Sequence, residues 1–422
     1  MKYLKLFETV SAYEAFAETD FVKPNVSYIT ESGGGVRYNP FIPPEPIIYN
    51  ASAKLSLDET KFSGTSGQLT IVSHTFENGV GRIEFNGEVT SIGNGAFYQC
   101  SSLTSIIIPS GVTKIGETTF YNCYNLRSVN ISSSIKSIGY RAFYMCNSLT
   151  SINIPDSVTS IGDNAFFGCS GSTSLEIGSG VTSIGSGTFG CCYVLTSVTI
   201  GNSVTSIGDS AFENCSGLTS ITIPDSVTSI GQNAFNNCSG LASIDIPSGV
   251  ISISSSAFQG CSGLESITVD SNNTKYDSRN NCNAIIETST NKLITGCKNT
   301  VITNNIASIG DSAFSGCRDL TSIVIPDSVT SINNYAFHSC SGLTSVTIGS
   351  GVTSIGNYIF VNCSSLTSII STRTTAPTVT KNTFQNIKSN GTLYVPRGAN
   401  YSTWMSTGNY YLGKYNWTKV EQ

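Results

Sequence analysis

Hydrophobic and polar residues recur along this chain with a period of 23 residues, shown clearly by Val227 to Gly249, VTSIGQNAFNNCSGLASIDIPSG. The step between copies is 23 residues throughout, except for a step of 56 residues between Val250 and Ile306. The eleven copies start at Val89, Val112, Ile135, Val158, Val181, Val204, Val227, Val250, Ile306, Val329 and Val352. Self-similarity at such a period predicts a solenoid in which each copy forms one coil.

Each copy contains three segments with different patterns. The alternating L-x-x-I-x-I run predicts a strand with one buried face, and V-T-S-I predicts a second short strand. Between them, Gly-x-x-Ala-Phe-x-x-Cys separates Ala and Cys by four residues, which predicts one helical turn. Asp163, Asp209 and Asp311 are predicted to cap such turns. One copy has too few apolar residues to fold alone, so neighbouring coils must bury its faces.

A cysteine column runs through all eleven copies, from Cys100 to Cys363. Neighbouring thiols would point in parallel, which is poor geometry for disulfides. We therefore predict that each is a small buried thiol whose S–H turns to a loop carbonyl. Such a column of reduced thiols suits a reducing compartment, or burial.

The repeated IPDSVTSIG (Ile154 to Gly162 and Ile223 to Gly231) and the CSGLTSI block (Cys215 to Ile221, with Cys340 to Val346 close to it) resemble the BspA-type leucine-rich repeat family. The resemblance covers about residues 89–422. It implies a mostly β, α/β solenoid: a right-handed leucine-rich-repeat superhelix with a parallel sheet on its inner face and short helical turns outside. The family also implies microbial surface and adhesion-like proteins with varied ligands.

The regions outside the copies suggest a division of the chain. Residues 1–39 are expected to hold an amphipathic helix (4–16) and a hairpin (25–38), as a mounting module or a cap. They resemble N-terminal segments of uncharacterised gut bacterial and phage proteins. Residues 40–50 are proline-rich and are expected to be a spacer, with a polyproline ligand site as the alternative. Residues 51–88 are expected to be degenerate capping repeats, and residues 89–370 the solenoid.

Two further stretches depart from the period. Within 270–305, Ala284-Ile-Ile-Glu and Lys292-Leu-Ile-Thr predict a hairpin, flanked by Cys282 and Cys297 as free thiols or an occasional disulfide. Residues 371–422 are expected to cap the last coil. The aromatic residues of this tail either pack as that cap or form an alternative binding or oligomer patch. The patch would consist of Tyr401, Trp404, Tyr410, Tyr411 and Trp417.

Charge and candidate chemistry narrow the function. Only 12% of residues are charged and the net charge is −5, which argues against nucleic acid and a polybasic membrane surface. No apolar window is long enough to span a membrane. The two histidines, His74 and His338, have no partner motif, and no phosphate-binding motif occurs. We therefore expect no enzyme, cofactor or metal site.

The outward positions of the predicted inner sheet vary more than any core column. A solenoid commonly binds through its curved sheet, so we expect a protein or glycan ligand there. The candidate residues are Arg127, Asn130, Asn153, Glu176, Thr199, Thr222, Asp245 and Glu265. The alternative is a structural or display component, such as a virion fibre, a decoration protein or a cell-surface rod, attached to a larger assembly through residues 1–40. No signal peptide is visible, which favours a cytoplasmic or virion-associated protein, whereas the resemblance favours the cell surface.

Overall fold

The computed structural model describes residues 44–65, 67–380, 382–408 and 410–422. The unit described here runs from Glu45 to Gln422. The helix and hairpin expected within residues 1–39, and the mounting role given to that module, lie outside the described residues.

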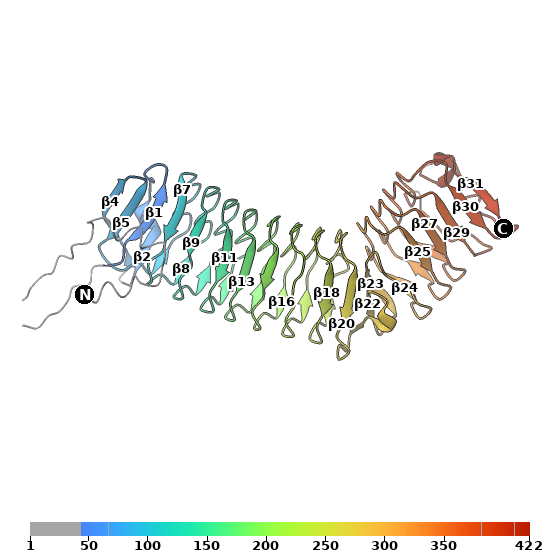
Figure 1. Ribbon diagram of the computed structural model, residues 1–422, viewed down its shortest axis with the longest axis horizontal. Coiled ribbons are helices and arrows are strands. Elements are labelled where there is room, and N and C mark those ends of the chain that lie inside the picture. The colour runs from blue at the N-terminus through green and yellow to red at the C-terminus, as the bar shows by residue number, and fades with distance from the viewer. Residues whose placement is uncertain (1–43, 66, 381, 409) are drawn as a thin grey trace, which may run out of the picture. The chain divides into compact units, whose positions relative to one another are not determined.

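The unit is a stack of coils, and the regular coils supply two sets of parallel strands (Figure 1); the coil that starts at Val204 contributes no strand to the first set, at residues 218–223. The L-x-x-I-x-I strands pair in register with a shift of one period, as in Ser151↔Ser174 and Ile152↔Leu175. They are β7 (Leu103–Ile107), β9 (Ser128–Asn130), β11 (Ser151–Ile154), β13 (Ser174–Ile177), β15 (Ser197–Thr199), β18 (Ser243–Ile246), β20 (Ser266–Val269), β25 (Ser322–Ile325), β27 (Ser345–Ile348) and β29 (Ser368–Ser371). Two strands without this motif, β30 (Thr392–Val395) and β31 (Thr418–Glu421), extend the last sheet in parallel. The predicted solenoid fold is thereby confirmed.

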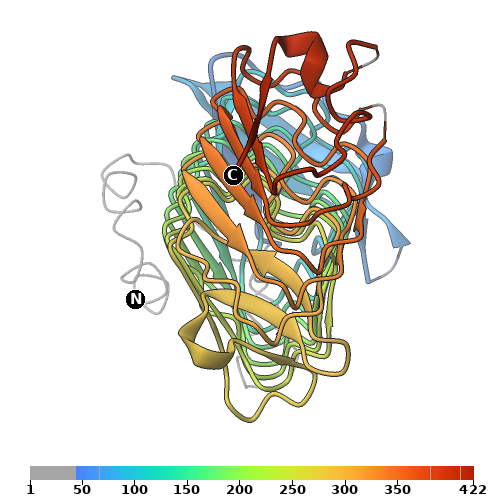
Figure 2. The ribbon, with the colours of Figure 1, turned by 90° about the vertical axis from the view of Figure 1, so that its right-hand side faces the viewer.

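The V-T-S-I segments form the second set of parallel strands. Each is two residues long and pairs with its neighbours through the Ser–Ile dipeptide, as in Ser206↔Ser229. The set comprises β6 (Ser91–Ile92), β8 (Lys114–Ile115), β10 (Ser137–Ile138), β12 (Ser160–Ile161), β14 (Ser183–Ile184), β16 (Ser206–Ile207), β17 (Ser229–Ile230), β19 (Ser252–Ile253), β24 (Ser308–Ile309), β26 (Ser331–Ile332) and β28 (Ser354–Ile355). Figure 2 looks along the stack from the side of β31, and in this view the coils before the insertion overlap with nearly the same outline.

The segment between the two strands is a run of tight turns and not the predicted helical turn. Ala142 N donates to Gly139 O and Cys146 N to Phe143 O, whereas the intervening Phe143 N donates to Ala165 O of the next coil. Two residues have positive φ in this segment of ten of the eleven copies, such as Arg141 at 51° and Met145 at 57°. These left-handed residues interrupt a helix and direct alternate N–H groups to the neighbouring coil. We call this surface the turn face.

The three predicted capping aspartates consequently have another role. Asp163 Oδ1 accepts the backbone N–H of Ser186 at 2.8 Å, and Asp209 Oδ1 accepts that of Gln232 at 2.7 Å. Asp311 does the same for Asn334. Because there is no helix N-terminus to cap, each carboxylate instead joins its coil to the next.

The core consists of columns of identical side chains. The phenylalanines from Phe97 to Phe258 are buried and stacked, with ring centroids 5.0–5.6 Å apart. Each column thiol from Cys123 to Cys261 donates to the carbonyl of a phenylalanine of the preceding coil, at Sγ–O distances of 3.0–3.6 Å. All cysteines among the described residues are free thiols. The thiol-to-carbonyl bonding predicted from the sequence is confirmed.

The N-terminal end of the stack is antiparallel. Strand β1 (Ile47–Ala51) lies between β5 (Val80–Phe85) and β7, and β5 forms a hairpin with β4 (Ile71–Glu77). Residues 47–50, within the range expected to be a spacer, are therefore part of a sheet, because Ile47 and Tyr49 alternate inward. Residues 51–88, expected to be degenerate capping repeats, cover the end of the core with this hairpin and with β2 (Phe62–Gly64) and β3 (Gly67–Gln68).

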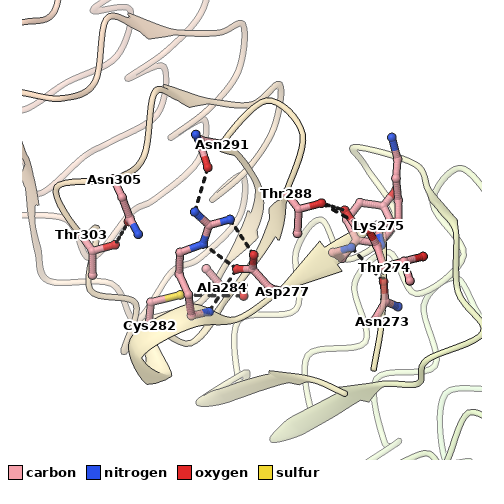
Figure 3. A network of polar contacts seen from close by, with 12 residues as sticks. Asn273, Thr274, Lys275, Asp277, Cys282, Ala284, Thr288, Asn291, Thr303 and Asn305 are labelled. Atoms are coloured by element: carbon pink, nitrogen blue, oxygen red, sulfur yellow. Dashed lines mark hydrogen bonds and ion pairs between the residues drawn. The ribbon is translucent and has the colours of Figure 1, made fainter. Parts of the chain in front are cut away.

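The insertion contains the predicted hairpin, β22 (Ala284–Glu287) with β23 (Lys292–Gly296), preceded by β21 (Tyr276–Asp277). Strand β23 then pairs in parallel with β24, which restores the regular stack. Figure 3 shows the polar contacts of this region: Arg279 donates to both carboxylate oxygens of Asp277 and to Asn291 Oδ1 at 2.8 Å. Cys282 and Cys297 are buried free thiols.

Candidate functional site

The outward row of the inner sheet is the surface that the sequence predicts to bind a ligand, and we call it the inner row. Asn130, Asn153, Glu176, Thr199, Thr222 and Asp245 all lie exposed on it. Parallel pairing aligns neighbours directly, with Asn153 opposite Glu176 and Glu176 opposite Thr199. Since parallel strands lie about 4.8 Å apart, the row presents one polar side chain at each such step.

The two other predicted residues, Arg127 and Glu265, are also exposed but stand in the column that precedes the outward serine. The Glu265 carboxylate forms an ion pair of 2.8 Å with Lys298 of the insertion, and this contact lowers its pKa. The charge of Glu265 is therefore partly used within the protein. Asp245 has no ion pair among the described residues, and its carboxylate accepts a hydrogen bond from the hydroxyl of Thr268, its partner on the next strand.

The inner row changes character after the insertion. In the sheet of β25, β27, β29, β30 and β31, register places Val324, Thr347, Ile370, Tyr394 and Val420 side by side. Val324 is 62% exposed and Val420 is 37% exposed. A shallow depression adjoins this apolar part, and its lining includes Val324, Thr347 and Asp327. The inner row thus begins with the apolar Ile107, is polar from Asn130 to Thr268, and is largely apolar after the insertion.

The threonines beside the inner row have a structural role that sequence reasoning missed. Thr173 Oγ1 donates to Thr150 O and Thr196 Oγ1 donates to Thr173 O, one period back along the chain. The V-T-S-I threonines do the same, as Thr228 Oγ1 does to Thr205 O at 3.0 Å. The sequence did contain a signal for this role, namely a threonine that recurs every 23 residues. A hydroxyl at that spacing can donate to the backbone carbonyl of the preceding coil.

The aromatic tail forms a cap, and not the alternative surface patch. Trp404 and Tyr401 are buried, and Trp404 lies against Phe384 at a centroid distance of 5.3 Å. Trp404 Nε1 donates to Pro377 O, and Trp417 Nε1 donates to Lys388 O at 2.8 Å. Only Tyr410 and Tyr411 remain half-exposed. The two indoles are buried because the last coil has no following neighbour to cover it.

A second surface that sequence reasoning missed lies on the turn face of the first four copies. The residue after the core phenylalanine is aromatic there, and the rings of Tyr98, Tyr121, Tyr144 and Phe167 stack at centroid distances of 5.0–5.2 Å. We call these four residues the aromatic strip. The signal was a run of aromatic residues at one repeat position, which becomes Gly190 in the fifth copy.

The titratable groups show how burial sets their chemistry. Burial raises the pKa of Cys100 to about 11 and that of Cys215, Cys261 and Cys363 to about 12. A nucleophilic cysteine requires a lowered pKa, so these thiols are held in their unreactive form. His74 bonds the Tyr49 hydroxyl and His338 bonds Ser339 Oγ, and burial lowers the pKa of both.

No group of three or more His, Cys, Asp or Glu side chains is placed to hold a metal ion within 44–422, the three masked positions aside. In the same part of the chain, no helix has the length and apolar character needed to cross a membrane.

The chain was compared with known families and structures. The family profile described as BspA type leucine rich repeat region matches residues 69–193, 168–286 and 285–402. No curated protein gives a significant match.

Three solved structures are similar. A leucine rich cell surface protein from Faecalibacterium prausnitzii shares 27% identity over 88% of this chain and 95% of its own, with a TM-score of 0.57. A leucine-rich repeat protein from Eubacterium ventriosum shares 21% identity over 90% of this chain and 85% of its own, with a TM-score of 0.51. One from Bacteroides ovatus shares 23% identity over 87% of this chain and 100% of its own, with a TM-score of 0.43.

Proposed function

Because the chain belongs to the BspA-type leucine-rich repeat family, we propose that it is a non-catalytic binding solenoid that recognises a protein or a glycan through its inner row. The observation that carries this proposal is the register of that row. From Asn130 to Asp245 its side chains are exposed and are drawn from Asn, Glu, Thr and Asp, and those on paired strands are aligned, whereas the columns beneath them are nearly constant.

The chemistry of the row suggests how a ligand is held. Its polar part, with Asn130, Asn153, Glu176 and Asp245, offers amide and carboxylate groups that bond hydroxyl or amide hydrogens. Its apolar part, from Val324 to Val420, offers surface that gains from leaving water. An extended ligand that lies across the strands would meet hydrogen-bonding groups at one end and apolar contacts at the other.

The polar part of the row can be tested by charge reversal. The doubly substituted Glu176→Lys/Asp245→Lys chain and the wild type would be applied to a printed array of neutral, sialylated and sulfated oligosaccharides and a panel of extracellular-matrix proteins. The matched control is Glu213→Lys, a carboxylate on the turn face. We expect the double variant to bind at least about tenfold more weakly and the control to bind as the wild type does. Equal binding by all three chains would remove the polar row as the site.

A display role at the cell surface is the second candidate, and one observation favours it. The similar structure from Faecalibacterium prausnitzii is described as a leucine rich cell surface protein. If residues 1–44 attach the solenoid to a larger assembly, their deletion should abolish attachment and leave the thermal unfolding of the solenoid unchanged. The deletion must stop before β1, because Ile47 and Tyr49 belong to the core. Attachment that survives the deletion would exclude this role for the segment.

A further inference from the structure

The aromatic strip occupies a position that the next four copies fill with small or polar residues. The residues that follow the core phenylalanine are Gly190, Glu213, Asn236 and Gln259 in the next four copies. In the first four copies they are three tyrosines and one phenylalanine, stacked at the spacing of the coils. The coils fold with either set, so the fold does not require the aromatic residues at this position.

The coil that starts at Ile135 concentrates bulky side chains at this surface. Tyr140 is 39% exposed and Met145 is 36% exposed. The guanidinium of Arg141 lies over two rings, 4.8 Å from the centroid of Tyr140 and 5.1 Å from that of Tyr144. Tyrosine, methionine and arginine are the residues enriched where proteins meet one another.

Arg141 has hydrogen-bonding capacity that the described protein leaves unused. Its Nε atom is shielded from solvent and has no hydrogen-bond partner among the described residues. The guanidinium likewise forms no ion pair within that part of the chain, although it is held between aromatic rings. A carboxylate from outside the chain would pair with the charge at the two terminal guanidinium nitrogens, which are not shielded as Nε is.

One carboxylate of the same surface is complementary to it. Glu117 is exposed in the coil before that of Arg141, and its side chain has no hydrogen bond or ion pair within the described chain. The strip is four coils long, so its midpoint falls between the coils that start at Val112 and Ile135. These two central coils carry Glu117 and Arg141.

We propose that the aromatic strip is the interface of a homodimer, in which a second copy of this chain packs antiparallel across a two-fold axis at that midpoint. The axis places Tyr121 of one copy opposite Tyr144 of the other and Tyr98 opposite Phe167, so that the whole strip is covered. It also sets the Arg141-bearing coil of each copy against the Glu117-bearing coil of the other, twice, because a two-fold interface repeats every contact. The proposal concerns the turn face and does not depend on the inner row.

Sedimentation velocity on the full chain tests this directly, over about 1–300 µM, where weak homodimers dissociate. We expect a concentration-dependent dimer that Arg141→Glu or Glu117→Arg alone weakens at least about tenfold, since each change places like charges together. An equimolar mixture of the two variants should dimerise again, because each copy then meets an opposite charge. A monomer at all concentrations, or a dimer that neither substitution affects, would overturn the proposal.

A matched control distinguishes a specific interface from general loss of surface aromatics. Tyr335 and Tyr358 form another stacked tyrosine pair, at 5.0 Å, on the turn face of later coils. The Tyr335→Ser/Tyr358→Ser chain should dimerise as the wild type does, whereas Tyr121→Ser/Tyr144→Ser should not. Circular dichroism would verify that each variant is folded. Equal loss of dimer in both double variants would contradict the assignment to the aromatic strip.

Discussion

Raising the pH above 9 should destabilise this solenoid through its thiol column. Burial raises the pKa of Cys215, Cys261 and Cys363 from an ordinary value near 9 to about 12. The unfolded chain therefore loses these protons at a lower pH than the folded chain. Stability is fully present below pH 9 and falls as the pH rises from 9 towards 12. At pH 10, the free energy of unfolding is lower than at neutral pH by about 1.4 kcal/mol for each such thiol, and by about 4 kcal/mol for the three together.

Urea unfolding at pH 7, 8, 9 and 10 with a reducing agent, followed by circular dichroism, measures this loss. The matched control replaces the three cysteines by alanine. Its stability at pH 7 will also differ, so the quantity to compare is the change between pH 7 and pH 10. The control should lose about 4 kcal/mol less than the wild type. All other groups are the same in the two chains, so their contribution to the change cancels. An equal pH-dependent loss in the two chains would refute the reasoning.

Two further substitutions test the packing by urea unfolding. Phe212→Ala should destabilise by about 3–5 kcal/mol, because the ring is buried and stacked at 5.6 and 5.5 Å on its neighbours. A loss below about 1 kcal/mol would show that the column does not carry the core. Gly296→Ala should also destabilise, by about 1–3 kcal/mol, because its Cβ would lie 2.2 Å from the Phe314 ring. The exposed Gly398→Ala meets no atom within 4 Å and so lacks this clash, although it carries the backbone cost of a positive φ that Gly296 does not have.

The sequence was sufficient to predict the core and the inner row, because both follow from a period of two within a period of 23 residues. It did not indicate the turn conformation of the outer segment. The positive-φ positions are held by residues as different as Thr118, Arg141 and Tyr335, so glycine and asparagine do not mark them consistently. Without that signal, the spacing of Ala and Cys favoured a helical turn.

The ends of the stack were the hardest part to predict, because they depend on contacts that occur once. The pairing of Ile47 and Tyr49 with β5 and β7 occurs once in the chain, so no repeated pattern in the sequence indicates it. The prolines before these residues indicated a spacer. The tail tryptophans fitted either a cap or a patch, since exposure depends on whether another coil follows. For the candidate site, exposure and register agree with the prediction, whereas binding at these residues stays a proposal.

Carboxyl footprinting is the most direct test of the proposed inner-row site. The chain would be labelled at its exposed carboxylates with and without a ligand found on the array, and read by mass spectrometry. We predict that the ligand protects Glu176 and Asp245, while Glu213 on the turn face is labelled equally in both states. Protection of Glu213 with full labelling of Glu176 and Asp245 would contradict the proposal.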